Sequence, residues 1–309
     1  MALCDGGDFG YEVSSYTRRF QDRENFLTEY GVARSYTFNS LRTFKEDCEA
    51  FYAEMEEGNM KGETQYVGFT RVSMSDLDGI DDIRSHLPKM RFFYDMNQEI
   101  LIVKFMVGTA HELSAGLLGI ELDRLVVSRT GQRRAIKSIG SARFKGLNRQ
   151  KESDFCYKPT TRTLEDDWPS VVFEVGVSET LRELQKDARF WLECSGEKTR
   201  VVILASVNKE ERSWTIERWQ HDPVAPRLQP ARNVGNPYAR NPYVAIHIQG
   251  LSMREGEIYT GASLIIPATL VFDPNELPPV QGAPLGPNDF EMTAQMLNLL
   301  NEDLWSGLM

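Results

Sequence analysis

The segment that most constrains the fold of this chain is a short apolar run, Val171–Val175, which carries one acidic residue, Glu174. A run of β-branched and aromatic residues of this length is typical of a central strand that is buried on both faces.

A second predicted strand, Ser153–Lys158, precedes this run and is joined to it by a loop. If Lys158 faces Ser170 across the loop, Asp154 lies directly opposite Glu174. Directly opposed residues of an antiparallel pair point to the same face, with Cβ atoms about 4.5–5.5 Å apart. Glu152, two residues before Asp154, shares this face in a regular strand.

Two or three carboxylates on one face repel each other, and a divalent cation removes this repulsion. Oxygen ligands of this kind favour Mg²⁺, or Mn²⁺ in its place. The spacing alone is equally compatible with a solvated pair of acids at two strand ends.

The surrounding pattern predicts a mixed α/β sheet. Hairpin-connected strands are antiparallel, whereas a helical crossover joins parallel strands. The predicted order is helix Thr109–Val127, strands Ile136–Phe144, Ser153–Lys158 and Val171–Val175, helix Ser178–Ser195 and strand Val201–Val207.

We expect three regions along the chain. Residues 1–90 form an extension with a loosely structured arm and an acidic amphipathic helix, Thr43–Glu57. Residues 91–273 form the α/β core. Residues 274–309 form a Pro-rich linker and a terminal helix, Phe290–Leu304. Within the core, the patterns further predict a hairpin of Arg91–Asp95 with Glu99–Phe105, a loop at Asp222–Pro242, and late strands at Tyr243–Gln249 and Ala262–Phe272.

Charge and cysteine content narrow the class of protein. No apolar run approaches the roughly 18 residues that cross a bilayer, and no signal peptide is visible, so we expect an intracellular protein of the cytoplasm or nucleus. The four cysteines show no disulfide or zinc spacing. The net charge of −10 argues against a protein coated with nucleic acid, but not against a local basic surface.

One such basic surface is predicted from the stretch Arg129–Lys158, which holds nine Lys and Arg against Glu152 and Asp154. It would contact the phosphates of a nucleic acid. A solvated loop and strand face is the alternative. A homodimer is compatible with the sequence, which does not specify the oligomeric state.

The stretch Phe92–Trp219 resembles the PD-(D/E)XK, or restriction-endonuclease-like, nuclease superfamily, in particular its small bacterial and fungal members. The resemblance depends on His111-Glu112 early in the first helix, on Lys151-Glu152-Ser153-Asp154, on the segment Glu174–Thr180, and on Leu184, Asp187 and Trp191-Leu192 in the next helix. It covers a little under half of the chain. It implies a restriction-endonuclease-like core that hydrolyses phosphodiester bonds with Mg²⁺, which Asp154 and Glu174 would bind with help from Glu112.

One position departs from the family pattern. The family places a lysine two residues after the acid, where this chain has Gly176. Counting 100° per residue along the following helix, Lys186 points away from the packed face, whereas Gln185 and Asp187 border it. Gln185 is therefore the predicted catalytic substitute. Lys151 points away from Asp154 in a regular strand, and a bulge would change that.

Three functions remain open from the sequence. The first is a Mg²⁺-dependent endonuclease. The second is a catalytically degenerate nuclease fold that binds nucleic acid or protein, which the missing lysine and the acidic net charge favour. The third is an unrelated metal-dependent hydrolase that reuses an acidic cluster.

Overall fold

The computed structural model describes residues 26–32, 34–57, 65–106, 109–177, 181–222, 244–273 and 290–308. The chain forms two compact units, Met1–Phe105 and Met106–Met309, and each is considered by itself. The hairpin that was expected to open the α/β core lies in the first unit. No helix among the described residues is long and apolar enough to span a membrane.

The first unit combines helices with a β-sheet in the order β1-β2-β4-β3, a sheet that the predicted helical extension did not include. Its elements are β1 (Arg34–Thr37), α2 (Leu41–Glu56), β2 (Tyr66–Thr70), α3 (Met74–Ile83), a 3₁₀ turn η1 (Arg84–His86), β3 (Met90–Asp95) and β4 (Ile100–Phe105). Strand β1 pairs in parallel with β2, so the expected arm is ordered at this point. The predicted β3–β4 hairpin is confirmed as an antiparallel pair.

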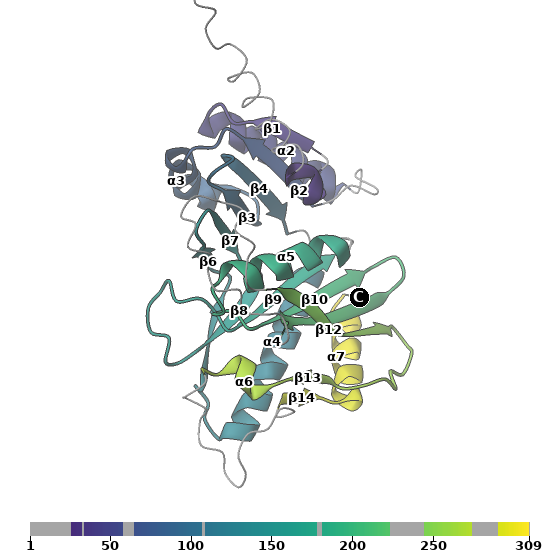
Figure 1. Ribbon diagram of the computed structural model, residues 1–309. Coiled ribbons are helices and arrows are strands. Elements are labelled where there is room, and N and C mark those ends of the chain that lie inside the picture. Colours follow the sequence, from purple (N-terminus) through teal and green to yellow (C-terminus); the bar gives the residue numbers. More distant parts are fainter. Residues whose placement is uncertain are drawn as a thin grey trace, which may run out of the picture. The chain divides into compact units, whose positions relative to one another are not determined.

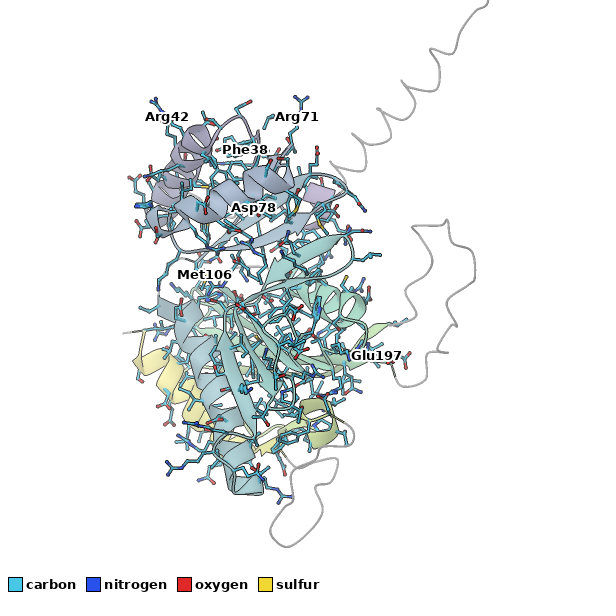
Figure 2. The ribbon with its side chains drawn as sticks, turned by 90° about the vertical axis from the view of Figure 1, so that its left-hand side faces the viewer. Phe38, Arg42, Arg71, Asp78, Met106 and Glu197 are labelled. Carbon is cyan, nitrogen blue, oxygen red and sulfur yellow. The ribbon has the colours of Figure 1, made fainter. Side chains whose placement is uncertain are left out.

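Helix α2 confirms the predicted amphipathic helix and begins at a capping box, in which Ser40 accepts the N–H of Thr43. Phe44, Cys48 and Phe51 form its buried face. On the opposite face Arg42, which extends outward in Figure 2, pairs with Glu46 one helical turn later. Burial of this apolar face therefore stabilises the helix more than the charged residues on its exposed face do.

The second unit is a mixed α/β fold around a sheet with the order β12-β11-β10-β9-β8-β5 (Figure 1). Its elements are α4 (Thr109–Thr130), β5 (Ile136–Gly140), β6 (Arg143–Lys145), β7 (Arg149–Glu152), β8 (Phe155–Pro159), β9 (Val171–Val177), α5 (Leu181–Cys194), β10 (Val201–Asn208), β11 (Ser213–His221), β12 (Ala245–Arg254), β13 (Leu264–Ile266), α6 (Ala268–Val271), β14 (Phe290–Met292) and α7 (Ala294–Ser306). Strands β9 and β10 are parallel, and the other pairs of this sheet are antiparallel, so the predicted mixed sheet is confirmed.

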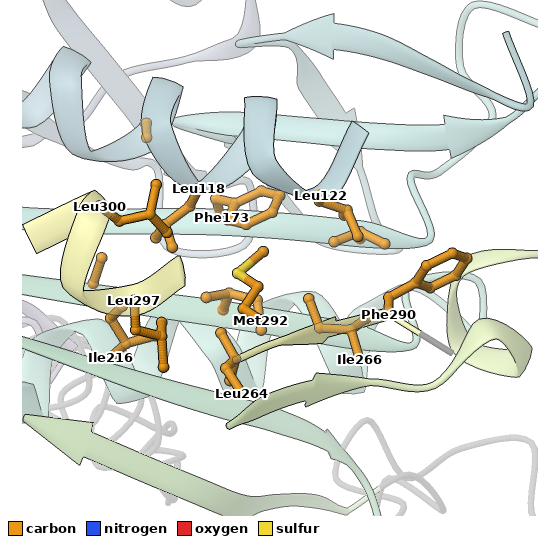
Figure 3. Close-up of a cluster of buried hydrophobic side chains, with 14 of the residues drawn as sticks. Leu118, Leu122, Phe173, Ile216, Leu264, Ile266, Phe290, Met292, Leu297 and Leu300 are labelled. Atoms are coloured by element: carbon orange, nitrogen blue, oxygen red, sulfur yellow. The ribbon is translucent and has the colours of Figure 1, made fainter. Parts of the chain in front are cut away.

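The main core lies between this sheet and helices α4 and α7 (Figure 3). Phe173 points from β9 into this core, beside Leu118 of α4, and Val175 of β9 and Leu297 of α7 belong to the same core. Because side chains alternate along a strand, Glu174 points to the other face, where α5 packs on β9 and β10. The terminal helix is thus part of the core of the second unit.

Several element boundaries differ from the sequence prediction. The predicted strand Ile136–Phe144 is divided into β5 and β6, and β6 forms a hairpin with β7. The predicted strand Ala262–Phe272 ends at β13, because Pro267 begins the short helix α6. The predicted terminal helix starts only at Ala294, where Thr293 accepts the N–H of Met296; the residues before it form β14.

Some predictions fall outside the described residues. These are most of the predicted arm, the first three residues of the predicted helix Ser178–Ser195, most of the Asp222–Pro242 loop and the Pro-rich linker.

Candidate functional site

The register between β8 and β9 agrees with the predicted pairing. Phe155 pairs with Phe173, and Tyr157 pairs with Val171. Strand β8 begins at Phe155, however, so Asp154 lies just before the ladder. Ser153 and Asp154 form a break between β7 and β8, and the alternation of side chains does not continue through it.

This break directs Asp154 toward the beginning of α4. Its Oδ2 atom accepts the backbone N–H of Val175 at 2.8 Å and lies 3.1 Å from Nε2 of His111. Both side chains are buried, with 2% or less exposed. The backbone of β9 and the imidazole of α4 therefore position this carboxylate.

Glu174 has a different set of neighbours, on the α5 face of the sheet. Its Oε1 atom accepts the indole N–H of Trp191 at 2.6 Å and lies 3.9 Å from Nζ of Lys151. The same ammonium lies 3.1 Å from Oδ1 of Asp187. All four side chains are buried. A carboxylate is stable at such a position only when a cation and hydrogen bonds compensate for the lost water.

Sequence reasoning missed Lys151 as the cation of this site. It lies in β7 of the β6–β7 hairpin, one residue before the end of the strand, and a regular strand would direct it away from Asp154. The break at Ser153 removes that constraint. The possibility of a bulge was the only sequence signal for this position. Glu152, expected beside Asp154, instead pairs with Arg143 at 2.8 Å.

The other predicted site residues have the following surroundings. Glu112 is exposed in the first turn of α4. Gln185 donates to Glu217 of β11 at 3.2 Å. Asp187, predicted to border the packed face of its helix, is 1% exposed, which confirms that prediction, while Lys186 is half-buried.

Glu217 stands in the same row of the sheet as Glu174. Leu204 of β10 pairs with Glu174 on one side and with Glu217 on the other, so the three side chains share one face. Neighbouring strands are about 4.8 Å apart, which places the two acids two strand spacings from each other. Gln185 therefore bonds the second acid of this row.

The basic stretch is only partly available at the surface. Lys151 lies in the acidic network, and Lys158 donates to the carbonyl of Leu164 at 2.5 Å. The exposed cations of the stretch are Arg129, Arg133, Arg134, Lys137 and Lys145. Arg129 lies in the last turn of α4, and Arg133 and Arg134 lie in the connection to β5. Lys137 belongs to the edge strand β5, and Lys145 ends β6.

The donor atoms can be compared with what Mg²⁺ requires. Within the described residues, no group of three or more His, Cys, Asp and Glu side chains is arranged to hold a metal ion. The predicted cluster of Glu112 with both acids is therefore not formed. Mg²⁺ commonly uses only one or two protein carboxylates and completes its six ligands with water and phosphate oxygens. Asp154, just before β8, and Glu174, in β9, offer oxygen donors for that smaller set.

The chain can be compared with known families, curated proteins and solved structures. No family model matches the chain, and no curated protein matches it. A solved structure from Anabaena variabilis, described as a candidate nuclease belonging to DUF820, is similar with a TM-score of 0.37 and 12% sequence identity. The match covers 69% of this chain and 90% of that one. The class defined by the structure itself is a mixed α/β fold with a buried network of acids and one lysine.

Proposed function

We propose that this protein is a metal-dependent nuclease of the restriction-endonuclease-like type. Asp154 and Glu174 would hold a divalent cation, Mg²⁺ or Mn²⁺, which when bound would activate a water and stabilise the charge of the phosphodiester transition state. The observation that carries this proposal is the position of Lys151, whose Nζ lies 3.9 Å from Oε1 of Glu174. The lysine that Gly176 cannot supply comes from β7.

Each residue of the network has a role that follows from its contacts. The N–H of Val175 and the imidazole of His111 fix the orientation of Asp154. Trp191 does the same for Glu174. The positive charge of Lys151 orients an attacking water and offsets part of the negative charge of the carboxylates. Asp187 holds this ammonium in place.

The substrate in this proposal is a nucleic acid, and DNA is favoured over RNA only by the family resemblance. Exposed Arg133, Arg134 and Lys137 would contact its phosphates. Gln185 has no catalytic part, because its amide is bonded to Glu217.

A second candidate function is favoured by the burial of the network. Asp154 is 5% exposed, Lys151 3% and Glu174 0%. A buried cluster from which water is excluded also suits a fold that binds nucleic acid without cutting it.

The test is cleavage of supercoiled plasmid and of end-labelled single strands with Mg²⁺ or Mn²⁺. We expect the wild type to cut, and Asp154→Asn and Glu174→Gln, which keep the shape of the side chains, to lose at least about 100-fold in rate. Glu165→Gln, an exposed acid outside the network, is the matched control. Circular dichroism verifies that each variant is folded.

Metal binding by calorimetry completes the experiment. Equal cleavage by wild type and both isosteric variants would overturn the assignment of the site. Retarded migration of DNA by the wild type, with neither cleavage nor heat of metal binding, would establish the second function instead.

A further inference from the structure

A second site lies in the C-terminal part of the second unit and goes beyond the proposed nuclease activity. A groove of about 720 Å³ runs between α7 and the segment that joins β12 to β13. None of the residues of the acidic network lines it. Its volume is in the range of ordinary ligand pockets, about 300–1,000 Å³.

Hydrogen bonds hold the two walls of this groove together. Asn298 of α7 accepts the N–H of Tyr259 at 2.8 Å and donates to the carbonyl of Tyr259 at 2.9 Å. Asn301 donates to the carbonyl of Arg254 and accepts the indole N–H of Trp305, each at 3.0 Å. Because these bonds exist within the unit, the groove is formed before any partner arrives.

The walls of the groove expose aliphatic side chains to water. Ile258 is 83% exposed and Leu299 is 54% exposed, and both line the groove, with buried Trp305 beside them. Covering apolar surface contributes roughly 25 cal/mol per Å², so a partner that covers both side chains is stabilised there. A single exposed aliphatic side chain is ordinary, but an exposed isoleucine and an exposed leucine that line one formed groove indicate a binding surface.

The charges that line the groove are acidic. They are Glu255, Glu257 and Glu302, and none of the described lining residues is Lys, Arg or His. Glu255 is paired with Arg212, which also lies over the ring of Trp305 at 5.2 Å, so Glu257 and Glu302 supply most of the negative field. This sign repels phosphates and attracts cations.

We propose that this groove binds a segment of a partner protein in which aliphatic side chains, one helical turn apart, are flanked by Lys or Arg. The aliphatic side chains cover Ile258 and Leu299, and the basic side chains meet Glu257 and Glu302. This is recognition of an amphipathic helix in a groove, with charge complementarity determining the choice of partner.

The test uses three fluorescein-labelled model peptides of equal length: a Leu/Lys amphipathic helix, a Leu/Glu helix of the same pattern, and a Ser/Lys peptide without leucine. Fluorescence anisotropy with the full chain is expected to show saturable binding of the Leu/Lys peptide, at least about tenfold tighter than either of the others. Ile258→Asp with Leu299→Asp should weaken this binding at least about tenfold, and Glu257→Lys with Glu302→Lys should shift the preference to the Leu/Glu peptide.

A charge-matched control separates the groove from general attraction to an acidic protein. Asp78→Lys with Glu165→Lys makes the same change in net charge at exposed positions outside the groove. We expect this control to bind like the wild type. Absence of saturable binding, equal binding of the Ser/Lys peptide, or equal weakening by the control would overturn the proposal. These outcomes do not depend on nuclease activity.

Discussion

The ammonium of Lys151 lies 3.9 Å from Oε1 of Glu174, although the two residues come from strands that do not pair with each other. Asp187, from α5, lies 3.1 Å from the same ammonium. One hairpin, one central strand and one helix thus meet in a single buried charge network.

The first prediction concerns the stability of this network. Lys151→Ala leaves Glu174 and Asp187 buried without their cation, and we expect a loss of about 3–5 kcal/mol in the free energy of unfolding. Urea unfolding measures this loss. Lys145→Ala, an exposed lysine of the same hairpin, should change stability by less than about 0.5 kcal/mol.

A double variant tests the mechanism of that loss. Lys151→Met combined with Asp187→Leu removes both a cation and an anion, and should be more stable than Lys151→Ala alone. Equal losses in the two variants would show that packing, and not uncompensated charge, is what Lys151 contributes.

A second prediction concerns two glycines of α4. A Cβ at Gly119 would lie 2.7 Å from the ring of Phe155, and the carbonyl of Gly119 accepts the hydroxyl of Tyr157. Gly119→Ala should therefore destabilise the protein by about 1–3 kcal/mol. At Gly116 a Cβ meets nothing within 4 Å, so Gly116→Ala should stabilise the helix by up to about 1 kcal/mol.

Thermal unfolding of the two variants measures the difference. Opposite shifts of the melting temperature are expected from the same substitution, three residues apart on one helix. A stabilising effect at both positions would show that the ring of Phe155 moves aside without cost.

A third prediction concerns pH. Burial alone opposes ionisation of Asp273, but hydrogen bonds from Arg162 and Arg200, at 2.6 and 2.7 Å, outweigh it and lower the pKa of this carboxyl well below its ordinary value of 3.8. The ionised group therefore stabilises the fold at neutral pH, and this contribution is lost as the pH falls below that ordinary value.

The comparison is between wild type and Asp273→Asn. At pH 7 the variant should be less stable by about 1.5–3 kcal/mol, as expected for hydrogen bonds to charged groups. The difference should narrow as the pH falls from about 5 to about 2. Asp166→Asn, an exposed aspartate, is the control, and a difference independent of pH would contradict the pKa argument.

A fourth prediction separates Gln185 from catalysis. Its amide donates to Glu217, which also accepts the indole N–H of Trp219 at 2.8 Å. Gln185→Ala should lower stability by about 0.5–1.5 kcal/mol through the lost hydrogen bond, and leave the cleavage rate of folded protein within about twofold. A loss of cleavage rate comparable to that of Asp154→Asn would show that Gln185 is a catalytic residue.

Much of the second unit could be predicted from the sequence, because it depends on local information. The loop after Lys158 and the alternation of side chains fixed the β8–β9 register, which the pairing of Phe155 with Phe173 confirms. The 100° rotation per residue of α5 correctly placed Asp187 at its packed face.

The composition of the site was decided by the tertiary structure. The break at Ser153 and Asp154 interrupts the alternation, so Lys151 reaches Glu174 and Asp154 turns to His111. Helix α5 packs across several strands, and this placement brings the amide of Gln185 within hydrogen-bond distance of Glu217. Sequence periodicity determines which face a side chain takes within one regular element, whereas the partner that it meets depends on how separate elements pack.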